Sequence, residues 1–260
     1  MKIVVAIKQV PERGAPVRVD ASGLRIDERG LQFAMNEPDA YALERALKLK
    51  MQHGGEVVAI SMGPERVAAT LRDALAKGAD RAMHIALNDL ASCDALGTAR
   101  LLAAAIAPEQ PDLVLTGLQS EDIGSGQTGV LMAALLGLPH ATLVLDIEKT
   151  EHGFCVKREL EDGWMQTVEL PLPCLLTVQS GGVTLSYATL MGIKRARTKE
   201  LRTVAAVQLA ADTGIDLNPV VALESIAPQH KQKTAQLLTG TPSQATAALV
   251  DKLRNEAHVL

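Results

Sequence analysis

Aromatic side chains are scarce in this chain of 260 residues, which has one Trp, two Tyr and two Phe, or 2% of the sequence. Such scarcity argues against a protein that binds single-stranded nucleic acid by stacking bases on aromatic rings. Hydrophobic residues still make up 47% of the chain and charged residues 22%, which is ordinary for a globular protein. The core is therefore predicted to consist of Ala, Val, Leu and Ile, as in parallel sheets covered by helices.

Cysteines are also few: there are three, far apart and without a C-x-x-C pair. This pattern indicates neither a disulfide framework nor a zinc site, and the histidines show no metal-ligand spacing. No apolar run approaches the ~18 residues that a membrane-spanning helix needs, and the first apolar run is too short for a secretory signal. We expect a cytoplasmic protein that binds no metal and does not insert into a membrane.

An excess of positive charge is missing too, since 26 basic residues stand against 30 acidic ones and the net charge is -4. Such a chain has no general field to attract a polyanion, so no nucleic-acid partner is expected. The marked basic cluster lies late in the sequence, at Lys194, Arg195, Arg197, Lys199 and Arg202.

Short apolar runs alternate with helical segments over the first 150 residues. Residues 2–7 are typical of a central strand, and residues 9–33 form a Pro- and Gly-containing excursion with a short hairpin. Asn36 is predicted to cap the next helix, which ends before Gly54. The alternation predicts an α/β fold in three layers, a parallel sheet with helices on both faces. Further strands are expected at 56–61, 81–85, 112–116 and 141–147, and helices at 64–77, 93–107 and 129–136.

The pattern changes after residue 147. A hairpin is predicted as an insertion at about 150–170, with Asp162-Gly163 at its turn, and an apolar strand at 174–178 returns to the sheet. Beyond Lys194 the alternation is lost until Thr241, Pro242 and Gln244 open a terminal helix with a capping box. We therefore predict an α/β domain at 1–193 and, at 194–260, an arm and helix that dock on another chain. A flexible tail of a monomer is the alternative.

A glycine-rich loop at residues 117–128 is the most informative candidate site. It follows a strand and leads into a helix, so its N–H groups and the helix amino terminus could hold a phosphate, with Ser125, Gln127 and Thr128 as further donors. An ordinary β–α loop is the alternative. Gly124–Gly129 also matches G-x-G-x-x-G, but this match follows the fourth strand rather than the first, which makes NAD binding a minority interpretation.

No constellation of catalytic side chains accompanies this loop. The sequence lacks both H-E-x-x-H and G-x-S-x-G, and His84, in a predicted strand, fits a packed or hydrogen-bonded residue better than a base. We expect that the chain has no catalytic residues of its own. It is therefore predicted to be a carrier or binding module that holds a nucleotide.

Several segments together resemble the beta subunit of electron transfer flavoprotein. They run in order from residue 2 to about residue 200, whereas the last sixty residues match only loosely. The matching segments are 2–11, 35–36, 44–50, 61–64, 74–81, Gln119 with 127–129, 157–163 and 186–190.

This resemblance implies a heterodimer in which a larger alpha subunit holds most of an FAD site. The beta subunit would bind AMP in a domain similar to the adenine nucleotide alpha hydrolases. Asp39, Met62 and the stretch 123–126 depart from common members of the family. By matching motifs, the AMP site would include Ala6, Asn36, Glu37, Pro38, Asp39, Met62, Gly117, Gln119, Asp122, Gly124, Ser125, Gly126, Gln127 and Thr128.

The family's docking loop for partner dehydrogenases matches residues 186–190. The resemblance makes Leu190 the anchor, an exposed side chain that fills a pocket on the partner. Tyr187 and Ile193 would flank it, and Lys194, Arg195 and Arg197 would steer an acidic surface toward it. The alternative is that Leu190 is buried within its own chain.

The function implied by the resemblance is electron transport. The chain would be the small subunit of a carrier that takes electrons from primary dehydrogenases onto FAD and passes them to a quinone oxidoreductase or another acceptor. An ATP- or AMP-binding module of the universal-stress type and an NAD-dependent dehydrogenase are the alternatives. Some family members hold a second FAD in place of AMP and bifurcate electrons; we expect AMP.

Overall fold

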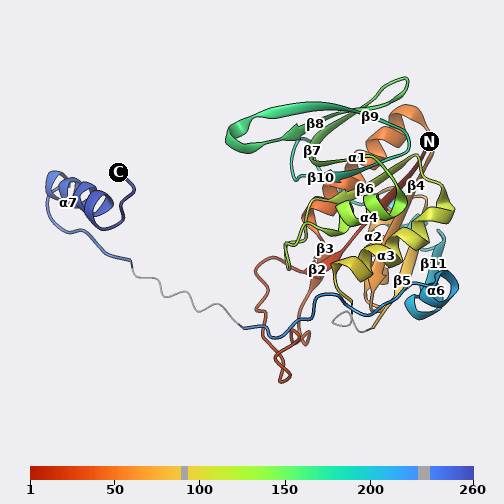
Figure 1. Ribbon diagram of the computed structural model, residues 1–260, viewed down its shortest axis with the longest axis horizontal. Helices are drawn as coiled ribbons and strands as arrows, with labels where there is room; N and C mark the ends of the chain where they lie inside the picture. Colours follow the sequence, from red (N-terminus) through yellow and green to blue (C-terminus); the bar gives the residue numbers. More distant parts are fainter. Residues whose placement is uncertain (89–92, 228–234) are drawn as a thin grey trace. The chain divides into compact units, whose positions relative to one another are not determined.

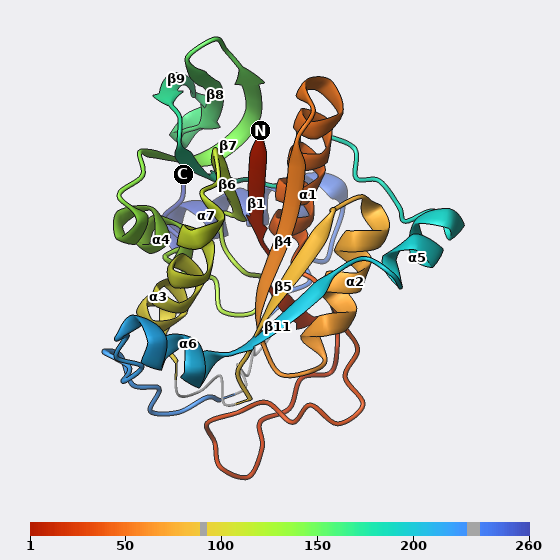
Figure 2. The ribbon, with the colours of Figure 1, turned by 90° about the vertical axis from the view of Figure 1, so that its right-hand side faces the viewer.

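The computed structural model describes residues 1–88, 93–227 and 235–260. The chain divides into two compact units, Met1–Ile226 and Ala227–Leu260. The first unit is built on a nine-stranded sheet in the order β11-β5-β4-β1-β6-β10-β7-β8-β9 (Figures 1 and 2). All neighbouring strands from β11 to β7 are parallel, and β8 and β9 are antiparallel additions. The strands are β1 (Lys2–Ala6), β4 (Glu56–Gly63), β5 (Arg81–Ala86), β6 (Leu113–Gly117), β7 (His140–Lys149), β8 (Gly153–Glu159), β9 (Met165–Pro171), β10 (Cys174–Val178) and β11 (Leu201–Ala205).

Helices cover both faces of this sheet, which confirms the predicted three-layer α/β fold. One face carries α1 (Glu37–His53) and α2 (Val67–Lys77), and the other carries α3 (Ala95–Ile106), α4 (Thr128–Leu136) and α6 (Ala206–Thr213). The short α5 (Leu190–Ala196) packs on α2. The described part of this unit also contains two 3-10 turns, η2 (Ala107–Glu109) and η3 (Glu161–Gly163).

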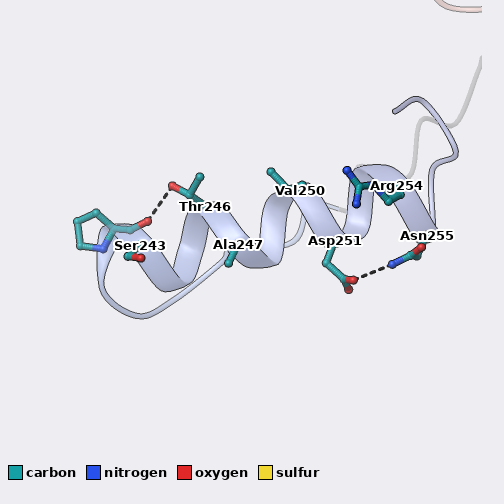
Figure 3. Close-up of a pocket in the computed structure, with 8 residues that line it drawn as sticks. Ser243, Thr246, Ala247, Val250, Asp251, Arg254 and Asn255 are labelled. Atoms are coloured by element: carbon teal, nitrogen blue, oxygen red, sulfur yellow. Dashed lines mark hydrogen bonds between the residues drawn. The ribbon is translucent and has the colours of Figure 1, made fainter.

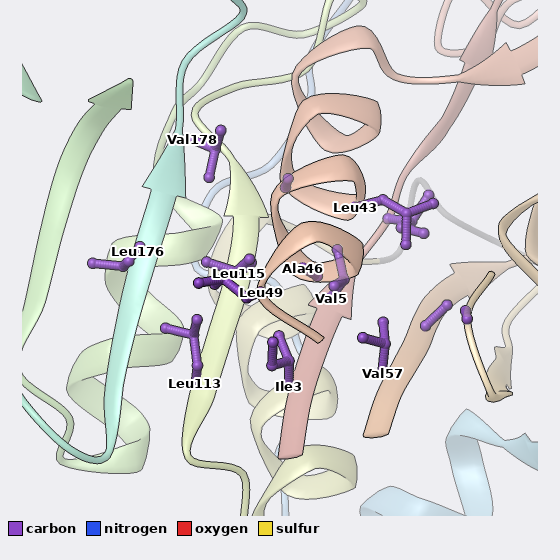
Figure 4. Close-up of a cluster of buried hydrophobic side chains, with 14 of the residues drawn as sticks. Ile3, Val5, Leu43, Ala46, Leu49, Val57, Leu113, Leu115, Leu176 and Val178 are labelled. Atoms are coloured by element: carbon purple, nitrogen blue, oxygen red, sulfur yellow. The ribbon is translucent and has the colours of Figure 1, made fainter. Parts of the chain in front are cut away.

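Aliphatic side chains hold α1 against the centre of the sheet (Figure 4). Leu43 and Ala46 of α1 are buried over Ile3 and Val5 of β1 and Leu115 of β6. Full burial of each larger side chain contributes ~1.5–3 kcal/mol. This packing fixes the first turn of α1 beside the carboxyl ends of β1 and β6.

The excursion after β1 contains the expected hairpin, closed by an isolated bridge between Val19 and Ile26. Its ends form a two-stranded sheet of β2 (Gln9–Pro11) and β3 (Phe33–Met35). The guanidinium of Arg66 lies 3.9 Å from the centre of the Phe33 ring, which ties this sheet to the start of α2.

The hairpin predicted at 150–170 is confirmed as β8 and β9, and it extends the main sheet through β7. Asp162 and Gly163 at its tip have φ of 55° and 76°, the left-handed conformation that an Asp-Gly turn favours. Leu143 of β7 has a φ of 60°. It precedes Val144, which pairs with both β10 and β8, and both pairings shift in register beside this residue.

The chain beyond Lys194 differs from the sequence prediction. Residues 201–205 form β11, which pairs with β5 in parallel, and α6 follows at once, so the α/β alternation continues. It was missed because β11 is an edge strand with largely exposed side chains and lacks the apolar run of a central strand. The first compact unit accordingly extends to Ile226, further along than the boundary predicted at residue 193.

The second unit contains α7 (Pro242–Asn255), with the predicted capping box between Thr241 and Gln244. A hollow of about 680 Å³ runs along this helix, where Thr246 bonds to the Pro242 carbonyl and Asn255 to Asp251 (Figure 3). All residues that line the hollow belong to α7, so it does not enclose a ligand. No helix within the described ranges is long and apolar enough to span a membrane.

Candidate functional site

Asp39, in the first turn of α1, joins the carboxyl ends of two central strands. One carboxylate oxygen accepts a hydrogen bond from the backbone N–H of Lys8, just after β1, and the other from that of Gly117, the last residue of β6; both are 2.7 Å long. Asp39 is buried, so these bonds replace the water that its carboxylate loses. The single side chain therefore sets the spacing between the two strand ends.

The environment of Asp39 changes its acidity. Burial raises the pKa of its carboxyl to about 6, although the hydrogen bonds from Lys8, Gly117 and Asn36 act in the opposite direction. The ionised carboxylate is the form that accepts from both backbone donors, because a protonated carboxyl presents an O–H to one of them. The tie between the strand ends is therefore sensitive to pH in the mildly acid range.

Asn36 is the N-cap residue of α1, as predicted, but its side chain makes no capping hydrogen bond to this helix. Its amide donates to the carbonyl of Gln119 and accepts from the N–H of Glu121, both at 3.0 Å. The side chain is fully buried, so both halves of the amide are committed to the glycine-rich loop. Asn36 and Asp39 thus hold this loop against the start of α1.

Lys8 fastens the same loop from the β1 side. Its ammonium group lies 2.7 Å from the Asp122 carboxylate and 3.2 Å from the Ser120 hydroxyl. Burial acts to raise the pKa of Asp122, but the charge and hydrogen bond of Lys8 outweigh it and hold that pKa below its usual value. Lys8, at the end of the first predicted strand, and Ser120, within the predicted loop, were not assigned roles of their own. Nothing in the sequence indicates that Lys8 contacts residues more than 110 positions away.

Two glycines allow the backbone to pack closely here. A Cβ at Gly117 would lie 2.3 Å from Asp39 Oδ1, so a side chain at this position would displace the carboxylate. A Cβ at Gly129 would lie 2.7 Å from both Thr116 Oγ1 and Thr177 Cγ2, so the first turn of α4 rests directly on β6 and β10. The amino terminus of α4 is therefore fixed at the carboxyl edge of the sheet.

The second half of the loop leaves polar groups available. Gly124 and Gly126 have φ of 69° and 63°, and the exposed Ser125 and Gln127 follow the part that Asn36 and Lys8 hold. Gln127 precedes α4 without capping it through its side chain, so the first N–H groups of α4, beginning at Thr128, have no side-chain cap. The Thr177 hydroxyl, buried nearby, has no partner among the described residues. An anion could be bound here by backbone and hydroxyl donors together.

The remaining predicted residues surround this centre without all contributing a free polar group. Pro38 and Glu37 form the first turn of α1, and the Glu37 N–H lies 3.4 Å from the Glu121 carboxylate. Ala6 and Met62 lie on the face of the sheet covered by α3, α4 and α6. Gln119 contributes its carbonyl to Asn36. The structure thus gathers the predicted residues from β1, α1, β4 and the glycine-rich loop at one edge of the sheet.

His84 is buried, and its Nε2 lies 2.8 Å from the Gly63 carbonyl, the packed role predicted for it. Among the residues described, no three His, Cys, Asp or Glu side chains come together as metal ligands.

An exposed apolar surface lies on and before α5. Leu190 is 87% exposed and Tyr187 is 93% exposed, so within this chain Leu190 is not a core residue. Leu190 is the first residue of α5 rather than part of a loop, and Thr189 caps this helix by accepting from the Gly192 N–H. We call Tyr187, Leu190, Met191 and Ile193 the α5 apolar surface.

The basic cluster divides into two parts beside this surface. Lys194, Arg195 and Arg197 are exposed, as is Arg202 on β11. Lys199 instead turns inward and donates to the carbonyls of Leu75 and Ala79 at the end of α2. The exposed cations therefore follow the apolar residues directly.

Comparison with known proteins gives a consistent result. A family model for the electron transfer flavoprotein domain matches residues 23–209. The electron transfer flavoprotein subunit beta of Methylophilus methylotrophus is 36% identical over 259 residues, covering 96% of this chain and 97% of its own. The subunit beta of Bradyrhizobium diazoefficiens and the mitochondrial one of Arabidopsis thaliana are 35% and 33% identical, with both chains covered completely. Full-length similarity at this level confirms the resemblance seen in the motifs, and the chain belongs to the electron transfer flavoprotein family, among its beta subunits.

Proposed function

We propose that this chain is the small subunit of a heterodimeric electron carrier, and that it holds AMP at the edge of the sheet formed by β1, β4 and β6. The observation that carries the AMP site is the pair of buried side chains, Asn36 and Asp39, that fix one glycine-rich loop over two strand ends. A loop held this firmly can present N–H groups in fixed directions, which is what a bound phosphate requires.

The groups that would hold the nucleotide are those with unused donors. Ser125, Gln127 and the first turn of α4 would bind the phosphate, and Ala6 and Met62 would bound the site on the sheet. The polar side-chain atoms of Asn36, Asp39 and Lys8 are committed to the loop and to the backbone after β1, so their role is to position the loop. These uncommitted donors are hydroxyl, amide and backbone N–H groups, which suit an anion.

The redox step in this proposal belongs to FAD, which supplies the electron-accepting and electron-donating chemistry when bound and is held mostly by the larger alpha subunit. The residues of this chain contribute binding and geometry. The α5 apolar surface would dock a primary dehydrogenase through Leu190, while Lys194, Arg195 and Arg197 attract an acidic rim on that partner. A quinone oxidoreductase or another acceptor would receive the electrons.

The second unit supports a heterodimer. None of the residues of α7 is buried, and Leu249 and Val250 are exposed. A helix of this length is marginal in water without packing. We propose that residues 194–260 contain the docking arm predicted from the sequence, with α7 packed on the alpha subunit.

The test is to purify the chain alone and together with its alpha subunit, then record absorption spectra and quantify the nucleotides released on denaturation. A flavin band only in the two-subunit complex, with one AMP per heterodimer, supports the proposal. FAD in place of AMP would identify the bifurcating type. ATP binding by the chain alone, without flavin, would favour a signalling module. Absorbance changes that depend on NAD would favour a dehydrogenase.

A further inference from the structure

Residues 182–199, which we call the strap, lead out of the sheet and carry the α5 apolar surface. Near its start, Ser186 is bound by the Glu44 carboxylate of α1. The Ser186 N–H donates to Glu44 Oε2 at 3.0 Å and the Ser186 hydroxyl donates to Oε1 at 2.9 Å. Glu44 is buried, so both oxygens of a desolvated carboxylate are committed to one residue of the strap.

Arg45, the next residue of α1, lies under the beginning of the strap. It is buried and pairs with Asp146 of β7 at 2.6 Å, while its other terminal nitrogen donates to the Leu145 carbonyl. A Cβ at Gly182 would lie 2.6 Å from this guanidinium, so the backbone of the strap passes directly over it. Neighbouring residues of one helix therefore support the strap at two points before Tyr187.

The other end of the strap is fixed on α2. A Cβ at Gly192 would lie 2.2 Å from the Ala76 carbonyl oxygen, which shows how closely α5 approaches that helix. Arg72 of α2 donates to the carbonyls of Ala196 and Lys199, at 2.6 and 2.8 Å, where α5 ends. The short stretch from Tyr187 to Met191 thus lies between two fixed points with its apolar side chains exposed.

We propose that Glu44 is a positioning residue for partner docking, whose grip on Ser186 holds Leu190 in the orientation that a dehydrogenase binds. The inference rests on the proposed function, since it takes the α5 apolar surface as the docking surface. A flexible anchor binds less tightly, because only the fraction of molecules in the competent conformation contributes to affinity. Glu44 would therefore raise the affinity of the heterodimer for the dehydrogenase without contacting the dehydrogenase itself.

The experiment uses the FAD-loaded heterodimer as the substrate of its primary dehydrogenase, purified from the same cells by its ability to reduce that heterodimer. Glu44→Ala should raise KM for the heterodimer about five- to tenfold, with kcat and flavin content unchanged. Glu44→Gln is the matched control. It removes the same charge, but its amide can still accept from the Ser186 N–H and donate to the hydroxyl, so KM should stay within about twofold of wild type.

Two further measurements separate positioning from a general loss of stability. In a Leu190→Ala background, Glu44→Ala should have no additional effect on KM, because the anchor that it orients is gone. Amide hydrogen exchange at residues 187–189 should be faster in Glu44→Ala and unchanged in Glu44→Gln. If Glu44→Ala does not assemble, Ser186→Ala removes one of the two bonds without altering the core and should raise KM about two- to threefold.

A wild-type KM in Glu44→Ala, or in Ser186→Ala where that variant replaces it, would overturn the inference. So would an equal rise in KM in Glu44→Ala and Glu44→Gln, or effects of Glu44→Ala and Leu190→Ala on KM that add in the double variant. If KM is raised in Leu190→Ala but normal in Glu44→Ala, the α5 apolar surface remains the docking surface and only the positioning role of Glu44 is refuted. A normal KM in Leu190→Ala would remove the docking surface itself, and the positioning role with it.

Discussion

Asp39 is the residue at which the local chemistry of the proposed site is concentrated. Its two oxygens accept from N–H groups that belong to different strands, and its pKa lies near 6 because of burial. Asn36 performs the corresponding role for the loop with a neutral amide. Together they make the strand ends and the loop one rigid unit, in which a change at a single residue alters the whole site.

We predict that Asp39 titrates near pH 6 in the folded protein, against ~3.9 in the unfolded chain. Between about pH 4 and 6 the folded state then holds more protons than the unfolded state. This group therefore makes folding less favourable as pH rises through that window, by on the order of 3 kcal/mol in total. Asp39→Asn should lose this pH dependence, as measured by urea unfolding at pH 4.5 and 6.5. A carboxyl resonance of Asp39 that titrates near pH 4 would contradict the prediction.

A second residue-scale prediction concerns Gly126, whose φ is +63° and whose added Cβ would meet nothing closer than 3.7 Å. Gly126→Val should cost ~1–3 kcal/mol through backbone strain alone and shift the loop, so that the heterodimer loses AMP. Gly137→Val is the matched control, because Gly137 has a φ of +66° and open space at the other end of α4. That variant should be destabilised similarly and keep its AMP. If the Gly126→Val and Gly137→Val heterodimers contain equal amounts of AMP, the glycine-rich loop is not part of the AMP site.

At the scale of elements, α5 combines an apolar anchor with a following row of cations on a helix fixed by α2. The sequence led us to expect Leu190 in a loop, and the structure places it instead at the first position of a helix capped by Thr189. A helix holds the side chain in fewer orientations than a loop does, which lowers the entropy cost of docking.

We predict that the two parts of this element contribute to different rate constants. Leu190→Ala should weaken dehydrogenase binding by ~1–3 kcal/mol, mainly through faster dissociation, because a buried anchor is lost. Replacing Arg195 and Arg197 with Gln should slow association and flatten its salt dependence. Stopped-flow binding at several ionic strengths distinguishes the two. Val207 is an exposed apolar residue on a different helix, α6. Val207→Ala is therefore the control and should change neither rate.

At the scale of the whole molecule, the two units differ in how much they can stabilise themselves. The first buries two apolar clusters on opposite faces of one sheet. The second contains α7, in which no residue is buried, although its capping box and the Lys252–Glu256 pair support the helix locally. Such local bonds contribute only tenths of a kcal/mol to about 1 kcal/mol each.

We predict that the amides of α7 exchange rapidly in the isolated chain and are protected at least ~100-fold in the heterodimer, equivalent to about 3 kcal/mol of added local stability. The amides of α3, which is packed in the core, should be protected in both states and serve as the internal reference. Unchanged exchange in α7 after addition of the alpha subunit would refute the docking arm.

The sequence by itself determined the elements whose signals are local. The apolar runs of the central strands, the Asp-Gly turn at residue 162 and the capping box at Thr241 depend on neighbours a few positions away, and all were found where predicted. The glycine-rich loop was recognised by the same means. Patterns of this range predict the α/β architecture and the edge of the sheet at which a ligand is expected.

Only the tertiary structure decided which residues meet. Asn36 satisfies every local rule for a cap, yet its amide bonds to a loop more than 80 residues away. Lys8 finds Asp122, Glu44 finds Ser186, and β11 pairs with β5 although its own side chains are largely exposed. Such contacts depend on how the sheet is ordered, and a polar side chain takes whichever partner the fold brings within hydrogen-bond distance. Burial favours this pairing, because a polar group left without a partner in the core costs ~1–3 kcal/mol.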